Sequence, residues 1–122
     1  MKKILVAEDD PASRELLVEV LEGLGYQVVE ACDGAEALEK AVEARPDLIL
    51  LDIQMPRLDG FAVVRQLRAD SRFAALPILA LTAYAMREDR EKTLRTGFDA
   101  HIAKPFDVPT LRLQIERCLG TG

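Results

Sequence analysis

The sequence contains no long hydrophobic run, and this excludes several classes of protein. No apolar stretch approaches the roughly 20 residues that a membrane-spanning helix needs. Behind the lysines at positions 2 and 3, the apolar run lasts only from Ile4 to Ala7 before acidic residues begin, which is too short for the core of a signal peptide. We therefore expect a cytoplasmic protein that does not act on a membrane.

Clusters of basic residues and metal-binding cysteine motifs are also lacking. Lys and Arg total 16 against 21 Asp and Glu, which gives a net charge of −5. With no basic cluster along the chain, this balance argues against a nucleic-acid partner. Cys32 and Cys118 lack the spacing of a metal site, so we expect two free thiols, as in a reducing compartment.

What the sequence does contain is typical of one globular domain. The chain has 122 residues, of which 49% are hydrophobic and 30% charged, enough for a single core. We expect residues 1–122 to form one domain without an output domain. Five apolar runs of strand length alternate with segments of helical periodicity, and these runs lie at 4–7, 27–31, 48–51, 77–81 and 100–103.

The alternation of strands and helices predicts the fold. Repeated strand–helix–strand units give a parallel sheet with right-handed crossovers and helices on both faces. The runs at 27–31 and 100–103 are the more polar ones, so we place them at the edges. The predicted fold is an α/β, doubly wound, five-stranded parallel sheet of order 2-1-3-4-5, the flavodoxin-like (βα)5 arrangement, in which ligands bind at the carboxyl ends of the strands.

Polar residues follow the four strands other than the second. They are Glu8 and Asp9 after the first, Asp52 after the third, Thr82 after the fourth and Lys104 after the fifth, and we expect them to converge. Clustered carboxylates repel one another unless a cation lies among them, and an oxygen-only set favours Mg²⁺. A lysine and a hydroxyl suit an oxyanion. Together these groups supply the parts for phosphoryl transfer to the Asp52 carboxylate.

Each of these residues taken alone also has a structural explanation. Asp52 could simply cap the next helix, Glu8 and Asp9 could favour a helix dipole, and Thr82 could be an ordinary strand residue. Lys104 is harder to explain in this way, because an apolar strand end seldom carries an inward lysine. Their joint occurrence favours a functional site.

Four motifs, in this order and at these distances, resemble those of a known family. They are Glu8-Asp9, then Asp52 with Met55-Pro56 and Gly60, then Thr82-Ala83, and last Lys104-Pro105. The whole chain resembles the receiver domain of bacterial two-component response regulators, in its stand-alone form. The resemblance implies a signalling phosphoprotein of a phosphorelay, not an enzyme beyond self-catalysed phosphorylation and dephosphorylation.

The resemblance assigns the acceptor and the metal. Asp52 would accept a phosphoryl group from a histidine kinase or a histidine phosphotransfer protein. Asp9, Asp52 and the backbone carbonyl of Gln54 would hold Mg²⁺, and Glu8 would act through a water molecule. Glu8 replaces the commoner Asp of the family, which lengthens the reach of the carboxylate and keeps its charge.

The resemblance also assigns phosphoryl binding and switching. Thr82, Ala83 and Lys104 would bind the phosphoryl group, and a cis bond would precede Pro105. Thr82, Pro105 and His101 would take part in the switch. His101 stands where the family usually has a rotating Tyr or Phe, so the alternative is a partly exposed imidazole without a switching role.

Further expectations concern the lifetime and the output of the phosphorylated state. We expect Gln54 and Tyr84 to limit attack by water, although Tyr84 could equally be a surface residue. The helix expected over Arg87–Thr96 has Leu94 as its one strongly apolar side chain, so we expect it to move on phosphorylation. With the strand at 100–103 and the last helix, which exposes Leu113, it would form the face that binds a downstream protein target, as a monomer or a phosphorylation-dependent dimer.

Three other functions fit parts of the sequence. A phosphatase of the haloacid-dehalogenase type needs a second acid two residues after the first, where this chain has Gln54. A flavodoxin-like electron carrier needs a phosphate-binding loop after the first strand, which the sequence lacks. A receiver-shaped scaffold that never takes phosphate is disfavoured by the intact set of site residues.

Overall fold

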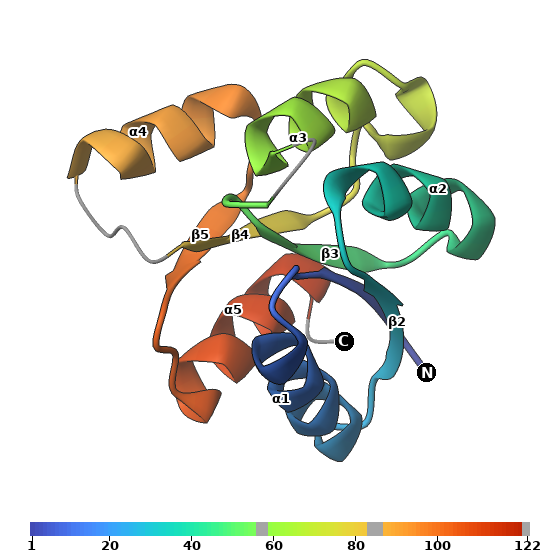
Figure 1. Cartoon of the computed structure of the whole chain (residues 1–122), viewed down its shortest axis with the longest axis vertical. Coiled ribbons are helices and arrows are strands. Elements are labelled where there is room, and N and C mark those ends of the chain that lie inside the picture. Colours follow the sequence, from blue (N-terminus) through green and yellow to red (C-terminus); the bar gives the residue numbers. More distant parts are fainter. Residues whose placement is uncertain (56–58, 83–86, 121–122) are drawn as a thin grey trace.

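The computed structural model describes residues 1–55, 59–82 and 87–120, with only the backbone for 87–90. Within these residues, strands and helices alternate along the chain (Figure 1). The strands are β1 (Lys3–Ala7), β2 (Gln27–Ala31), β3 (Leu48–Asp52), β4 (Ile78–Thr82) and β5 (Ala100–Ala103). The helices are α1 (Pro11–Gly23), α2 (Gly34–Ala44), α3 (Gly60–Arg68), α4 (Arg87–Thr96) and α5 (Val108–Leu119), with a 3₁₀ turn, η1 (Ser71–Phe73).

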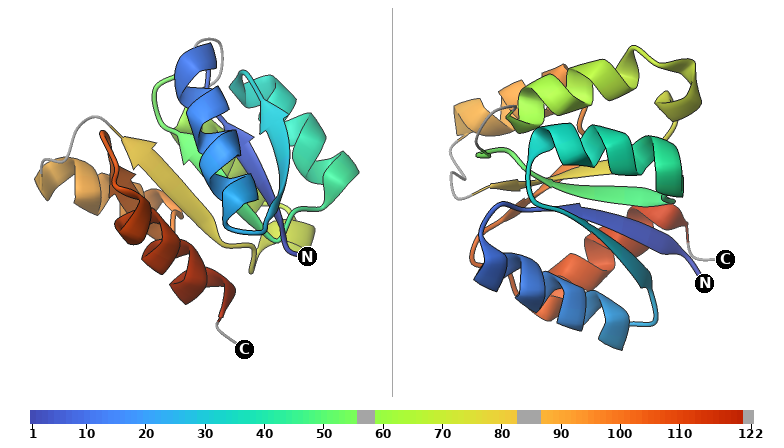
Figure 2. Two further views of the ribbon diagram at one scale, coloured as in Figure 1. Left: turned by 90° about the horizontal axis from the view of Figure 1, so that it is seen from below. Right: turned by 45° about the vertical axis from the view of Figure 1, so that its right-hand side comes forward.

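The strands form one parallel sheet in the order β2-β1-β3-β4-β5. Helices α1 and α5 cover one face of the sheet, and α2, α3 and α4 cover the other, as Figures 1 and 2 show. The predicted fold class and strand order are therefore confirmed. No helix in the described part of the chain is long and apolar enough to cross a membrane.

The central strand β3 is buried along its whole length because both of its faces carry helices. Ile49 and Leu51 face the cluster under α2 and α3, and Leu48 and Leu50 face the cluster under α1 and α5. The edge strands β2 and β5 are only partly buried, as their polar residues predicted.

Aspartates begin four of the helices at the carboxyl end of the sheet. In each case a side-chain oxygen accepts a backbone N–H of the first turn, which satisfies a donor that the helix itself leaves unpaired. These caps are Asp10 for α1, Asp33 for α2, Asp59 for α3 and Asp107 for α5. The caps fix where each loop ends and thus where the residues after each strand are held.

Several apolar residues at helical spacing are exposed. Leu16, Val42 and Val108 fit the helical periodicity but lie on the flank of their helices, with Leu16 52% exposed. Leu94 is also exposed, and the chain at the end of α4 is anchored instead by the buried Phe98, whose ring meets Phe61 of α3 edge-on. On these helices the buried face is therefore narrower than the face formed by all apolar residues at helical spacing.

Candidate functional site

Asp52 is the last residue of β3 and lies almost fully buried, with 5% of its surface exposed. Its Oδ1 accepts the backbone N–H of Gln54 at 3.0 Å. The start of α3 packs directly behind it, since a Cβ on Gly60 would lie 2.8 Å from both the Asp52 carbonyl oxygen and the Ile53 Cα. Only glycine fits there, which gives the Gly60 of the sequence motif a steric reason.

The acidic pair follows β1 at the neighbouring strand end. Glu8 is buried, with 2% exposed, whereas Asp9 is exposed. One carboxylate oxygen from each of Glu8, Asp9 and Asp52 lies within 4.8 Å of the other two. Three carboxylate oxygens at this separation, with no histidine or cysteine in the cluster, fit a hard cation such as Mg²⁺.

Lys104 enters the same cluster from the end of β5. Its Nζ donates to Glu8 Oε2 at 2.7 Å and to Asp52 Oδ2 at 3.2 Å. Burial alone would lower the pKa of Lys104, but its hydrogen bond to Glu8 and the charges of Asp52 and Glu8 outweigh burial and raise it. The ammonium therefore stays charged, and the bond that follows it, Lys104–Pro105, is cis as predicted.

Negative charge exceeds positive charge in the cluster. Burial and the neighbouring Asp52 carboxylate raise the pKa of Glu8 from 4.5 to about 7, although Lys104 opposes the shift. One ammonium thus faces three carboxylates. A divalent cation would offset this excess.

Three of the remaining predicted residues, Thr82, Gln54 and His101, lie in the part of the chain that the structure describes. Thr82 ends β4, is buried, and its carbonyl accepts the Lys104 backbone N–H at 2.8 Å. Gln54 is exposed at the rim, and His101 lies partly buried on β5. Pro56, Ala83 and Tyr84 lie outside the described residues.

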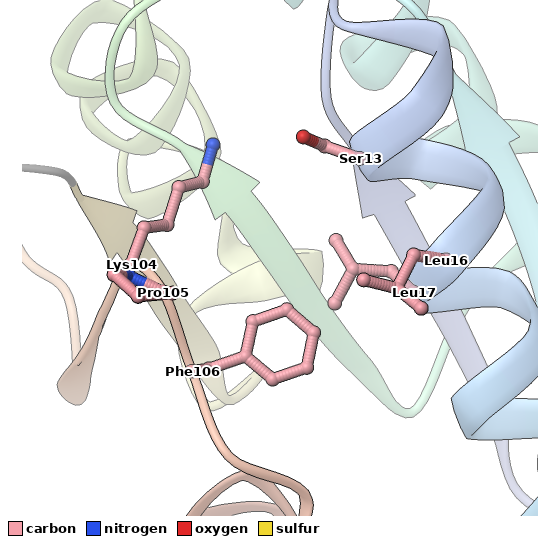
Figure 3. A pocket seen from close by; sticks show the side chains of 6 residues that line it. All are labelled: Ser13, Leu16, Leu17, Lys104, Pro105 and Phe106. Carbon is pink, nitrogen blue, oxygen red and sulfur yellow. The ribbon is translucent and has the colours of Figure 1, made fainter.

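An apolar cavity of about 330 Å³ opens beside Lys104, between α1 and the loop that leads from β5 to α5. In Figure 3 the Lys104 ammonium and the Ser13 hydroxyl lie at one end of it, and Phe106 faces Leu16 and Leu17 across the other. The exposure of Leu16 is thus explained by its place on the wall of this cavity.

Sequence reasoning missed Arg14, which contacts the acidic pair from behind. Its Nη1 donates to the Glu8 carbonyl at 2.8 Å and its Nε pairs with Glu30 at 3.3 Å. The sequence around Arg14 does not mark it as a site residue, because one of its partners is a backbone oxygen and the other, Glu30, lies on the distant strand β2.

The sequence profile of the response regulator receiver domain matches residues 4–116. This chain belongs to the response regulator receiver domain family. Its relatives include the polar-differentiation response regulator DivK of Brucella anthropi, 38% identical over 119 residues that cover 98% of this chain and 97% of DivK. The DNA-binding dual master transcriptional regulator RpaA of Synechocystis is 40% identical over 119 residues, and this chain spans about half of it, 49%.

Solved receiver structures superpose closely on this one. Chemotaxis protein CheY4 of Vibrio cholerae has 36% identity and a TM-score of 0.92, with 98% of this chain and 99% of that chain covered. The receiver domain of sensor histidine kinase PA1611 of Pseudomonas aeruginosa has 38% identity and a TM-score of 0.91, with 98% of each chain covered, and a magnesium ion lies in its active-site cleft. Receiver domains are signalling phosphoacceptors, and the family resemblance read from the sequence is confirmed.

Proposed function

We propose that Asp52 of this receiver domain accepts a phosphoryl group from a histidine kinase or a histidine phosphotransfer protein. One observation carries the proposal: the Asp52 carboxylate belongs to an acidic cluster with Glu8 and Asp9, and it also accepts from the Lys104 ammonium. The acids suit a cation, and the ammonium suits the oxygens of an arriving phosphoryl group.

In the proposed metal site, Asp9, Asp52 and the Gln54 carbonyl would hold Mg²⁺, with Glu8 acting through water. The bound ion would neutralise charge on the acids and on the phosphoryl oxygens. The Glu8 carboxylate is placed for this role beside Asp52, because its Oε2 accepts from Lys104 Nζ at 2.7 Å.

The proposed transfer forms one bond and breaks one. An oxygen of the Asp52 carboxylate attacks phosphorus, the bond from phosphorus to the donor nitrogen breaks, and the histidine ring leaves with the electron pair. Lys104, with Thr82 and Ala83, would bind the phosphoryl oxygens. Gln54 and Tyr84 would limit attack by water, and a Tyr84→Ala variant that loses phosphate at the wild-type rate would contradict their role.

The proposed output is a change in the face made by α4, β5 and α5, to which a downstream protein target would bind. This protein would act there as a monomer or as a phosphorylation-dependent dimer. The Thr82 carbonyl accepts the Lys104 N–H, which links the site to the end of β5. A shift at the site would reach His101 on β5 and Pro105 just after it through this bond. Exposed Leu94 and Leu113 lie on α4 and α5. Amide hydrogen exchange should change in these three elements on phosphorylation, and unchanged exchange there would refute this output face.

We place the protein in the cytoplasm and without a nucleic-acid partner, in line with its free thiols and net charge of −5. The competing function is a receiver-shaped scaffold that takes no phosphate.

Intact mass after incubation with acetyl phosphate, with and without Mg²⁺, tests the proposal. We expect one added phosphoryl group that requires both Mg²⁺ and Asp52. The Asp52→Asn variant should gain nothing, and Asp59→Asn, a matched change at an exposed helix cap, should gain the group like the wild type. No gain in the wild type under any condition would favour the scaffold.

A further inference from the structure

Arg14, in the first turns of α1, joins the acidic pair to the edge strand β2. Its guanidinium donates to the Glu8 carbonyl oxygen at 2.8 Å and to Glu30 Oε1 at 3.3 Å. The Arg14 side chain is 21% exposed, against 53% for Glu30. A partly buried guanidinium that donates in two directions fixes the two groups relative to each other.

The backbone of Glu8 is thus held from two sides. Its N–H donates to the Ala31 carbonyl of β2 at 3.1 Å, and its carbonyl accepts from Arg14. That carbonyl belongs to the planar peptide that links Glu8 to Asp9. The orientation of this peptide sets the direction in which the Asp9 side chain leaves the chain.

Asp9 has more need of such support than the other acids of the cluster. Glu8 and Asp52 are buried and both contact Lys104, whereas Asp9 is exposed. The placement of its carboxylate within 4.8 Å of the other two therefore depends on the loop backbone.

We propose that Arg14 is a positioning residue of the metal site, which acts through the Glu8 carbonyl to hold Asp9 in place for Mg²⁺. This inference rests on the proposed function, in which the acidic cluster binds Mg²⁺. Glu30 pairs with Arg14 and offsets its charge, so that the guanidinium can lie behind the acids with little repulsion of the cation.

Charge and position predict opposite results when Arg14 is removed. Loss of a positive charge beside the acids would by itself strengthen Mg²⁺ binding. Loss of the hydrogen bond to Glu8 weakens it, because Asp9 is no longer held. Arg14→Lys separates the two effects, since lysine keeps the charge but lacks the planar fork that reaches both partners.

The test is the Mg²⁺ dissociation constant of the full chain, measured by isothermal titration calorimetry. We expect Arg14→Met to weaken binding roughly tenfold, the scale of outer residues that orient metal ligands. Arg14→Lys should weaken it at least as much, because lysine keeps the positive charge that repels the cation. Arg112→Met is the matched control, because Arg112 also pairs with a glutamate, Glu116, on the exposed surface of α5. It makes the same change of charge and should leave the affinity unchanged.

Several outcomes would overturn the inference. Unchanged or tighter binding in Arg14→Met, or wild-type affinity in Arg14→Lys, would show that Arg14 does not position the ligands. If Arg14→Met fails to fold, as circular dichroism would show, Arg14→Lys decides alone. A wild-type chain that binds no Mg²⁺ would overturn the metal site itself, and with it this inference, whereas phosphoryl uptake by mass tests Asp52 separately.

Discussion

At the carboxyl end of the sheet two buried carboxylates share one ammonium, whereas at the amino end one guanidinium is surrounded by acceptors that it satisfies. The second cluster is built on Arg68, the last residue of α3. Its nitrogens donate at 2.7–2.9 Å to the carbonyls of Phe73, Leu76 and Gly97 and to the carboxylate of Asp99.

The amino-end cluster is complete within the chain. Asp99 also accepts the Ile78 N–H at 2.8 Å, so its carboxylate binds both the Arg68 guanidinium and the backbone at the start of β4. Among the described residues, most acceptors of Arg68 are neutral carbonyls, and the charge of the Asp99 carboxylate matches that of the guanidinium. This cluster joins α3, η1, β4 and the turn before β5.

The carboxyl-end cluster is unbalanced. Three carboxylates stand against Lys104, and the pKa of Glu8 rises to about 7 as a result of burial and Asp52. A balanced ionic cluster thus stabilises the fold, whereas an excess of one charge marks a place where a ligand of opposite charge binds.

The largest expected effect is at the amino end. Arg68→Met leaves Asp99 and several carbonyls without their donor, so we expect a loss of about 3 kcal/mol in the free energy of unfolding. Urea denaturation measures it. Arg72→Met is the control, since Arg72 is about half-exposed and pairs with its neighbour Asp70, and it should cost less than about 0.5 kcal/mol. Equal losses in the two variants would show that the Arg68 cluster adds no more stability than an exposed ion pair.

The next effect is a pH dependence at the carboxyl end. In the folded state the pKa of Glu8 lies at about 7, above its ordinary 4.5, so the native state binds more protons than the unfolded state between these values. Without Mg²⁺, stability should therefore fall as the pH rises from about 5 to about 8, by roughly 2 kcal/mol from this group.

Urea denaturation from pH 5 to pH 8 checks this contribution. The wild type should lose more stability over this range than Glu8→Gln, which cannot titrate there. Saturating Mg²⁺ should reduce the difference, because a bound cation favours the ionised carboxylate. Parallel pH curves for the two proteins would contradict the prediction.

The smallest effect has opposite signs at the two ends. At pH 8 without Mg²⁺, Asp52→Asn should raise the free energy of unfolding by about 1 kcal/mol, because relief of repulsion with Glu8 and Asp9 outweighs the weakened contact with Lys104 at 3.2 Å. Its amide oxygen still accepts from the Gln54 N–H. Asp99→Asn, the same change at the amino end, should lower it by a similar amount, since it weakens the pair with Arg68. Urea denaturation of both variants measures these changes in the free energy of unfolding. A change of the same sign in both variants would show that the two clusters do not differ in this way.

The sequence was sufficient for the fold because its signals are local. Apolar runs mark the strands, and Asp10, Asp33, Asp59 and Asp107 mark helix starts by a bond to a residue three positions on. The convergence of Glu8, Asp9, Asp52 and Lys104 follows from parallel topology alone. The structure brings these four together as expected.

Other features lay beyond the sequence because they depend on contacts between distant segments. Arg68 and Arg14 bind backbone carbonyls, which every residue carries and no pattern reveals. Leu16 has the spacing of a core residue, and only the position of Phe106 shows that it lines a cavity instead. The pairing of Lys104 with Glu8 is likewise a side-chain geometry that strand ends do not specify.

The aspartate caps have a consequence for the kinetics of encounter. Because α1, α2, α3 and α5 all begin at the carboxyl end, Asp10, Asp33, Asp59 and Asp107 add their charges to those of Glu8, Asp9 and Asp52 on the same end of the molecule. The resulting field turns an approaching basic surface toward this end before any contact forms. Association with such a surface should therefore slow as ionic strength rises, while a free anion receives no such guidance.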